Sequence, residues 1–445
     1  MERGNRLYSE LKQCKTMKEI TQRIPDYIYD RLTFIMIGYW CCVPIFAMIY
    51  SYVTRTDADL LIYLSVLVSG IVGIYLIVLR FIKLNIIQKV KTKGYIKEII
   101  PQFSLFIMLI WILFSCFHAK NKYYAFIGEG YSHEGFLTFI AYAGFFGSSL
   151  FITKKDVYKK FLIIFCLVAT SLSFLTILQY LGFEIRAFSG YMKLAGTFHN
   201  TNHFGYYLTL SAICSSGLFL ISSKKYQQLI YLSQFFIIFS ALIFNNTFGA
   251  YLGVLGGLVI TIIIFSLCLG QFKVKFIIPF IVAILLSVVL NLTTSIVESN
   301  LNVLQKDTAE IIKNTEKSGK AGSGRWELWV GAVQFIREEP LLGYGPENLA
   351  HNYAQIGINM LKPHNEYLQF AASSGLPSLL FYLIAMVSLY LKGIKNRKKL
   401  DLLVVLSFCV LSGYLISAFV GNTKFYVTPY FMIFLALATK TKLKE

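Results

Sequence analysis

Long runs of apolar residues recur along the whole chain and are separated by short polar segments. A run of about 20 apolar residues spans the roughly 30 Å of hydrocarbon in a bilayer. Such runs lie at 33–53, 60–79, 101–118, 135–152, 161–181, 204–221, 228–244, 250–269, 276–292, 376–391, 402–420 and 425–439. None carries Lys, Arg, Asp or Glu in its interior, where a charge is costly. The pattern predicts an all-α integral membrane protein with about twelve transmembrane helices, forming one polytopic domain over residues 1–445.

The charge distribution predicts the orientation of these helices. Only 15% of the residues are charged, yet the net charge is +19. Most of the 42 Lys and Arg residues fall in alternate connections, beginning with the N-terminal segment and ending with the C-terminal one. Cytoplasmic loops carry this excess, so both termini are expected in the cytoplasm. The basic excess is then explained by the lipid bilayer, and no sequence motif indicates a nucleic-acid partner.

One connection is much longer than the others and is predicted to be extracytoplasmic. It runs over residues 292–375, between the ninth and tenth predicted helices. The pattern within it predicts a surface helix at 296–317 and helices at 325–339 and 347–355, with Pro340 ending the middle one. Long structured loops are usually functional, so the active site is expected here.

His364 is the sharpest candidate for acid–base chemistry, because histidine transfers protons near neutral pH. It follows Pro363 at the start of a predicted helix, whose positive end favours a neutral imidazole. A histidine bonded to a loop carbonyl would give the same pattern. Arg325 has the paired donors that suit phosphate oxygens, although an arginine that caps the loop or pairs with Glu327 is an alternative.

Two further segments carry polar residues on the predicted outer side. The connection at 182–207 holds two cations and a cluster of amide and imidazole side chains: Arg186, Lys193, His199, Asn200, Asn202 and His203. Asp57 and Asp59 form a DxD in the first outer loop, where paired carboxylates could hold a divalent cation. Two acids in a short turn are common, and the eight Cys show no metal-ligand spacing. We therefore predict no metal and no cofactor.

Several motifs together resemble the O-antigen ligase and Wzy-type polymerase superfamily. The segments are GRWELWVGAVQFIREEPLLGYGPENL (324–349), PHNEYLQFAASSGLPSLLFYL (363–383) and GTFHNTNHFGYYL (196–208). The resemblance implies a bacterial, metal-independent glycosyltransferase with a GT-C-like fold in the cytoplasmic membrane. The donor would be an undecaprenyl-diphosphate-linked oligosaccharide, transferred to an acceptor glycan at the outer face. Polymerisation of a surface or capsular polysaccharide is favoured over transfer to a terminal acceptor, with a flippase and a chain-length regulator as expected partners.

The resemblance also implies roles for individual residues. His364 would be the catalytic base, and Arg325 would bind the diphosphate. Arg186, or less well Lys193, would be a second cation. Asn200, Asn202, His203, Asn365 and Tyr367 would bind or orient the substrate.

A transporter or flippase of lipid-linked glycan is the main alternative from another class, because twelve helices are typical of transporters. The apolar spans lack the ionisable residues that ion relays usually require. No pair of matched broken segments relates the two halves of the chain. The sequence therefore favours the enzyme.

Overall fold

The computed structural model describes residues 9–54, 56–86, 88, 95–130, 132–183, 194–312, 324–422 and 424–443. These residues are organised by helices alone, with no β-strand among them. Ten helices are long and apolar enough to cross a membrane. They are α3 (Asp26–Thr54), α4 (Asp59–Leu84), α7 (Ile100–His118), α10 (Lys155–Tyr180), α11 (Thr201–Ile221), α12 (Lys225–Asn245), α13 (Phe248–Leu269), α14 (Ile278–Thr294), α18 (Glu366–Asn396) and α19 (Leu402–Ser417). An adjoining 3-10 turn extends the helical spans of α14, α18 and α19 to Val274–Thr294, Glu366–Lys399 and Leu402–Val420.

The other two predicted spans are helices too, but shorter ones. The run at 135–152 forms α9 (Phe136–Leu150), and the run at 425–439 forms α20 (Thr428–Ala438). At 1.5 Å per residue, 15 and 11 residues fall short of the hydrocarbon thickness. Both helices pack against each other inside the bundle, where the residues that flank them are covered by protein rather than lipid. The sequence predicted about twelve spanning helices. The described residues contain ten helices that are long enough to span and two apolar helices that are shorter.

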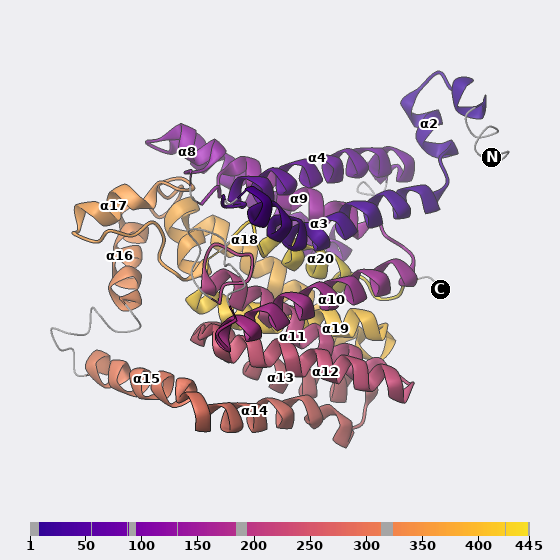
Figure 1. Cartoon of the computed structure of the whole chain (residues 1–445). Coiled ribbons are helices and arrows are strands. Elements are labelled where there is room, and N and C mark those ends of the chain that lie inside the picture. The colour runs from indigo at the N-terminus through magenta and orange to yellow at the C-terminus, as the bar shows by residue number, and fades with distance from the viewer. Residues whose placement is uncertain are drawn as a thin grey trace.

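The long helices run roughly along one direction and give the molecule two ends (Figure 1). α4 packs on α9, α7 on α18, and α13 on both α19 and α11. One end carries the short helices α8 (Lys122–Ile127), α16 (Arg325–Glu338) and α17 (Leu349–Gln355), and we call it the site end. The short helix α2 (Met17–Arg23) lies at the opposite end.

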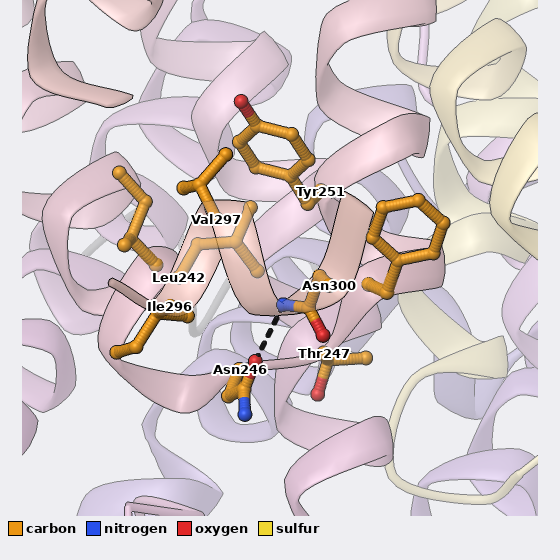
Figure 2. Close-up of a pocket in the computed structure, with 9 residues that line it drawn as sticks. Leu242, Asn246, Thr247, Tyr251, Ile296, Val297 and Asn300 are labelled. Carbon is orange, nitrogen blue, oxygen red and sulfur yellow. Dashed lines mark hydrogen bonds between the residues drawn. The ribbon is translucent and has the colours of Figure 1, made fainter. Parts of the chain in front are cut away.

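The described residues of the long connection before α18 include three helices, and residues 313–323, with the end of the helix predicted at 296–317, lie outside the described part. α15 (Ile296–Ile312) follows α14, and none of its residues is buried. Its first turn docks on the connection between α12 and α13, where Asn300 donates a hydrogen bond of 2.7 Å to Asn246 beside a small pocket (Figure 2). α16 and α17 share a small core of their own, which includes Leu328, Phe335 and Tyr353.

α18 is broken at Gly375, which has φ 82° and ψ 160°. The break frees backbone groups that the loop before α17 satisfies. The amides of Tyr344 and Gly345 donate to the carbonyls of Ala372 and Ser373, at 3.1 and 2.7 Å. The amide of Leu376 donates to the carbonyl of Pro340 at 2.8 Å. The half-helix 366–374 is therefore fixed to the loop at 340–345.

A buried ion cluster holds the opposite end together. Arg80 of α4 contacts Asp26 and Asp30 of α3, each at 2.9 Å, and Lys83 contacts Asp26 at 3.0 Å. The side chains of Arg80 and Asp30 are 4% and 2% exposed. These charges sit at helix ends, where sequence analysis placed the membrane boundary. Each buried charge is paired, so the cluster fixes α3 against α4.

Candidate active site

His364 lies at the site end, directly before the half-helix 366–374. Its backbone has φ 51°, a left-handed conformation that is uncommon for a residue with a side chain. Asn365 follows as the helix cap, its side-chain oxygen accepting from the amide of Leu368 at 3.0 Å. Nδ1 of His364 lies 3.2 Å from Nδ2 of Asn422, in the connection between α19 and α20. Strained residues held by their surroundings cluster at functional sites, and His364 fits this description.

The surroundings of His364 favour its neutral form. Burial lowers the pKa of His364 to about 4, and nearby positive charges act in the same direction. These charges belong to Arg325, Lys362 and Lys424, from three different segments. An imidazole that stays neutral is able to accept a proton from a substrate.

Arg325 is the first residue of α16 and follows Gly324, which has φ 84°. Arg325 is half-buried, and its positive charge lowers the pKa of His364. The same charge acts on the hydroxyl of Tyr206 of α11. The structure therefore brings the predicted arginine within electrostatic reach of the predicted histidine, although the two are 39 positions apart and the rest of α16, α17 and their loops lie between them in the chain.

Two buried lysines complete the positive side of the site. Nζ of Lys362 lies 2.7 Å from Oε1 of Glu347, and both side chains are almost inaccessible. Lys424 is 4% exposed and lies next to the ring of Phe425, with Nζ 5.5 Å from the ring centroid. Burial, together with the charge of Lys362, lowers the pKa of Lys424 to about 8.

Histidines and one aspartate line the neighbouring side of the site. Nδ1 of His199 lies 2.7 Å from Oδ2 of Asp59, and the hydroxyl of Tyr426 donates to the other oxygen of Asp59. The ring of His203 stacks on Tyr426 at 5.6 Å, and the titratable side chains near it are His199, His364 and the two lysines. The predicted residue His203 is thus part of the same cluster as His364.

The DxD hypothesis gains no support from this geometry. Asp59 faces His199 and Tyr426, while Asp57 is exposed. Among the described residues, no group of three or more His, Cys, Asp or Glu side chains has the arrangement of a metal site.

The other predicted substrate residues are placed as follows. Asn200 caps α11, its side-chain oxygen accepting from the amide of Asn202 at 2.7 Å. The hydroxyl of Tyr367 donates to the carbonyl of Leu415 at 2.8 Å, and its ring contacts Phe419. These contacts give Asn200, Asn365 and Tyr367 structural roles in the two helix starts that border the site. Arg186 and Lys193 lie outside the described residues.

An apolar cavity of about 510 Å³ lies within the bundle, and Glu366 is the residue of its lining that is nearest in sequence to His364. Its walls come from α4, α7, α9, α18 and α20, and include Ile112, Phe370 and Phe431. Glu366, two positions after His364, is the charged residue in the lining of this cavity. Its carboxylate accepts hydrogen bonds from Tyr382 and Tyr414 at 3.0 and 2.8 Å.

Sequence reasoning missed Lys362, Lys424, Asn422 and Glu366. A lysine in a loop usually indicates a solvated residue, so neither lysine stood out. One signal was present: Lys424 is the only charged residue between the last two apolar runs, within AFVGNTKFYV (418–427). A lone charge in so short a connection between two spans is a reason to suspect a site.

Comparison with known proteins supports the resemblance seen in the motifs. Residues 234–383 match the Wzy_C family model, described as O-Antigen ligase. The matched region contains Arg325 and His364, and ends before Asn422 and Lys424. No curated protein matches the chain. Over residues 234–383, the chain is therefore similar to the O-antigen ligase family, whose members transfer lipid-linked glycans.

Proposed function

We propose that the protein is a glycosyltransferase that elongates a bacterial surface polysaccharide, using an undecaprenyl-diphosphate-linked saccharide as donor. The observation that carries the proposal is that the half-buried His364, held in a strained conformation and kept neutral by its surroundings, lies within electrostatic reach of Arg325. A neutral base and a fixed cation are what this transfer needs: one accepts a proton, and the other stabilises the departing phosphate.

The reaction would proceed in one displacement. The acceptor hydroxyl attacks the anomeric carbon of the donor sugar, and its proton passes to Nε2 of His364. The bond between that carbon and the phosphate oxygen breaks, and its electron pair leaves with the lipid diphosphate. Arg325 stabilises the negative charge that grows on the leaving group. Direct displacement inverts the anomeric centre, and the reaction needs no metal ion.

Asn422 would hold His364 in the tautomer that the reaction requires. For Nε2 to accept a proton, Nδ1 must carry the ring hydrogen. Oδ1 of Asn422 is buried and makes no hydrogen bond in the arrangement described above. Rotation of this amide by half a turn presents Oδ1 to Nδ1–H, and satisfies both atoms.

The apolar cavity would receive part of the donor's isoprenoid chain. The lining of the cavity is almost entirely apolar. Its charged residue, Glu366, is two positions from His364 in the chain. A chain entering there would present its diphosphate to the charged cluster. The site end would face outward, as the distribution of Lys and Arg along the chain predicts.

The test is an assay of purified protein with undecaprenyl-diphosphate-linked repeat units. Wild type is compared with His364→Ala and with His351→Ala, an exposed histidine on α17. Elongated glycan from wild type and His351→Ala, but not from folded His364→Ala, supports the proposal. Turnover that requires a non-glycan acceptor would make the protein a ligase. Absence of turnover together with transport of the lipid-linked glycan would contradict an enzyme and favour the flippase.

A further inference from the structure

The segment that leads to His364 has little backbone support of its own. Residues 356–361 follow α17 as an irregular and largely exposed stretch, and Lys362 and Pro363 are buried at its end. Among the described residues, no backbone group of 359–364 exchanges a hydrogen bond with another backbone group. The backbone therefore does not determine where His364 stands, and the contacts of side chains do so.

One buried ion pair anchors the end of this segment. Nζ of Lys362 lies 2.7 Å from Oε1 of Glu347, and the two side chains are 9% and 2% exposed. Lys362 is two positions before His364, so the pair holds the chain close to the imidazole. A buried charge is costly when its partner is missing, and the pair therefore resists separation.

Glu347 stands on a firm support. The side chain of the next residue, Asn348, accepts from the amide of Asn121 at 2.9 Å and donates to its carbonyl at 3.1 Å, which fixes the turn to the start of α8. The amide of Gly345, two positions before Glu347, donates to the carbonyl of Ser373 in the half-helix at 2.7 Å. The carboxylate that holds Lys362 is thus fixed on both sides.

Glu347 and His364 share a backbone conformation that residues with a side chain seldom adopt, with φ 59° and 51°. Such a conformation persists only where its surroundings impose it, and the ion pair joins the two segments that contain it. We propose that Glu347 and Lys362 are positioning residues, whose ion pair holds His364 in place as the base of the transfer reaction. This assignment rests on the proposed glycan transfer and names the contact that keeps its base in position.

Lys362 also acts on the protonation of the base. Burial, together with the charges of Arg325, Lys362 and Lys424, lowers the pKa of His364 to about 4. His203 is the other titratable side chain that faces His364. A neutral residue at position 362 should raise the pKa of His364, and a carboxylate there should raise it further. Exchange of the two charges therefore separates the effect on position from the effect on protonation.

The test uses four variants of the full chain in nanodiscs. Lys362→Arg keeps the ion pair. Lys362→Met with Glu347→Gln, the neutral pair, removes it without leaving a buried charge, and Lys362→Glu with Glu347→Lys, the exchanged pair, restores it with opposite signs. Lys155→Met with Asp401→Asn is the matched control, because that ion pair joins the starts of α10 and α19 at 2.9 Å, at the opposite end.

Two measurements are made on each variant. Turnover of undecaprenyl-diphosphate-linked repeat units gives kcat and the KM for the donor at a pH where His364 is neutral. Carbethoxylation of His364 by diethyl pyrocarbonate, followed by mass spectrometry at a series of pH values, gives the pH midpoint of this residue without any turnover, because only a neutral imidazole reacts.

The neutral pair should lower kcat roughly ten- to a hundredfold and leave the KM for the donor unchanged, because the base is displaced rather than the binding site. Lys362→Arg and the exchanged pair should each retain more of kcat than the neutral pair. The pH midpoint of His364 should be lowest in wild type, higher in the neutral pair and highest in the exchanged pair. The control should match wild type in both measurements.

The outcomes separate this assignment from the proposed function. Wild-type kcat in the neutral pair would overturn the positioning role, and so would kcat in Lys362→Arg as low as that in the neutral pair. An equal midpoint in wild type, the neutral pair and the exchanged pair would overturn the action of Lys362 on protonation. Absence of glycan transfer by wild type would overturn the proposed function, while the expected order of midpoints would still support the action of Lys362 on His364.

Discussion

Nδ2 of Asn422 lies 3.2 Å from Nδ1 of His364, although the two residues are 58 positions apart in the chain. His364 stands at the head of the half-helix that begins α18, and Asn422 stands in the connection that leads to α20. The contact ties the predicted base to a segment that its own motif does not include.

Replacing Asn422 by Ala should remove the group that fixes the tautomer of His364. We expect kcat to fall by roughly a hundredfold, with little change in the KM for the donor, because a positioned base contributes about this much. Asn422→Asp keeps an acceptor for Nδ1–H and adds a negative charge beside the ring. In that variant kcat should recover in part, and the acid limb of its pH profile should move to higher pH. Equal losses in both variants, with no shift of the limb, would contradict a positioning role.

The pH profile of wild type follows from the pKa of His364. Burial lowers this pKa to about 4, so the base is neutral at higher pH and kcat/KM should fall only as the pH drops through that value. Arg325→Gln removes a positive neighbour, so the pKa of His364 should rise and the acid limb should shift upward toward pH 6.5. Arg337→Gln, an exposed change on the same helix, serves as control and should leave the limb in place.

Gly375→Ala should lower activity through the loop rather than through the spanning helix. A methyl group there would meet the carbonyl oxygen of Leu341 at 1.9 Å, and the residue would keep a φ that favours glycine. The loop at 340–345 and the half-helix must then separate, which displaces His364. We expect kcat to fall roughly ten- to a hundredfold. Gly38→Ala, with no atom within 4 Å of the added carbon, should be neutral.

Arg80→Met should destabilise the protein without touching its chemistry. The change leaves Asp30 buried and unpaired, which costs roughly 3–5 kcal/mol of unfolding free energy. Unfolding in a denaturing detergent titration measures this loss. Adding Asp30→Asn should restore part of the stability. If the site end and the opposite end are independent, turnover per folded molecule should equal that of wild type.

Chelation should not affect turnover, since the proposed mechanism uses fixed cations. Activity should persist in excess EDTA and in Asp57→Ala, whose side chain is exposed. Inactivation by EDTA with recovery on addition of a divalent cation would contradict the mechanism. Asp59→Asn is less informative, because Asp59 also contacts His199 and Tyr426.

The sequence predicted the features that depend on local pattern. Apolar runs located all twelve apolar helices, and Pro340 and Pro363 bounded the helices of the long loop as expected. His364 and Arg325 could be named because each stands at a helix start with a recognisable motif. The length of α9 and α20 could not be predicted, since apolar residues beyond a helix end look the same as those within it.

The rest of the site depends on contacts between distant segments. Lys362 and Lys424 are 62 positions apart, and they meet because α18 is hydrogen-bonded to α19 and α19 packs on α20. Asn422 is informative only once its partner is known. Glu366 falls one position after the helix cap and resembles an ordinary first-turn acid, which is a solvated residue in most helices.

The join between the half-helix 366–374 and the loop at 340–345 is made by three hydrogen bonds from one backbone to another. Backbone hydrogen bonds do not depend on side-chain identity. The residues that this contact chiefly requires are therefore the glycines at 343 and 375. Two other loop positions are also constrained: Gly345 has a positive φ and no room for a Cβ beside Ala119, and the ring of Tyr344 packs against Phe335. Because the contact is made largely by backbone atoms, the loop fixes the half-helix that follows His364 without contributing a charged side chain of its own.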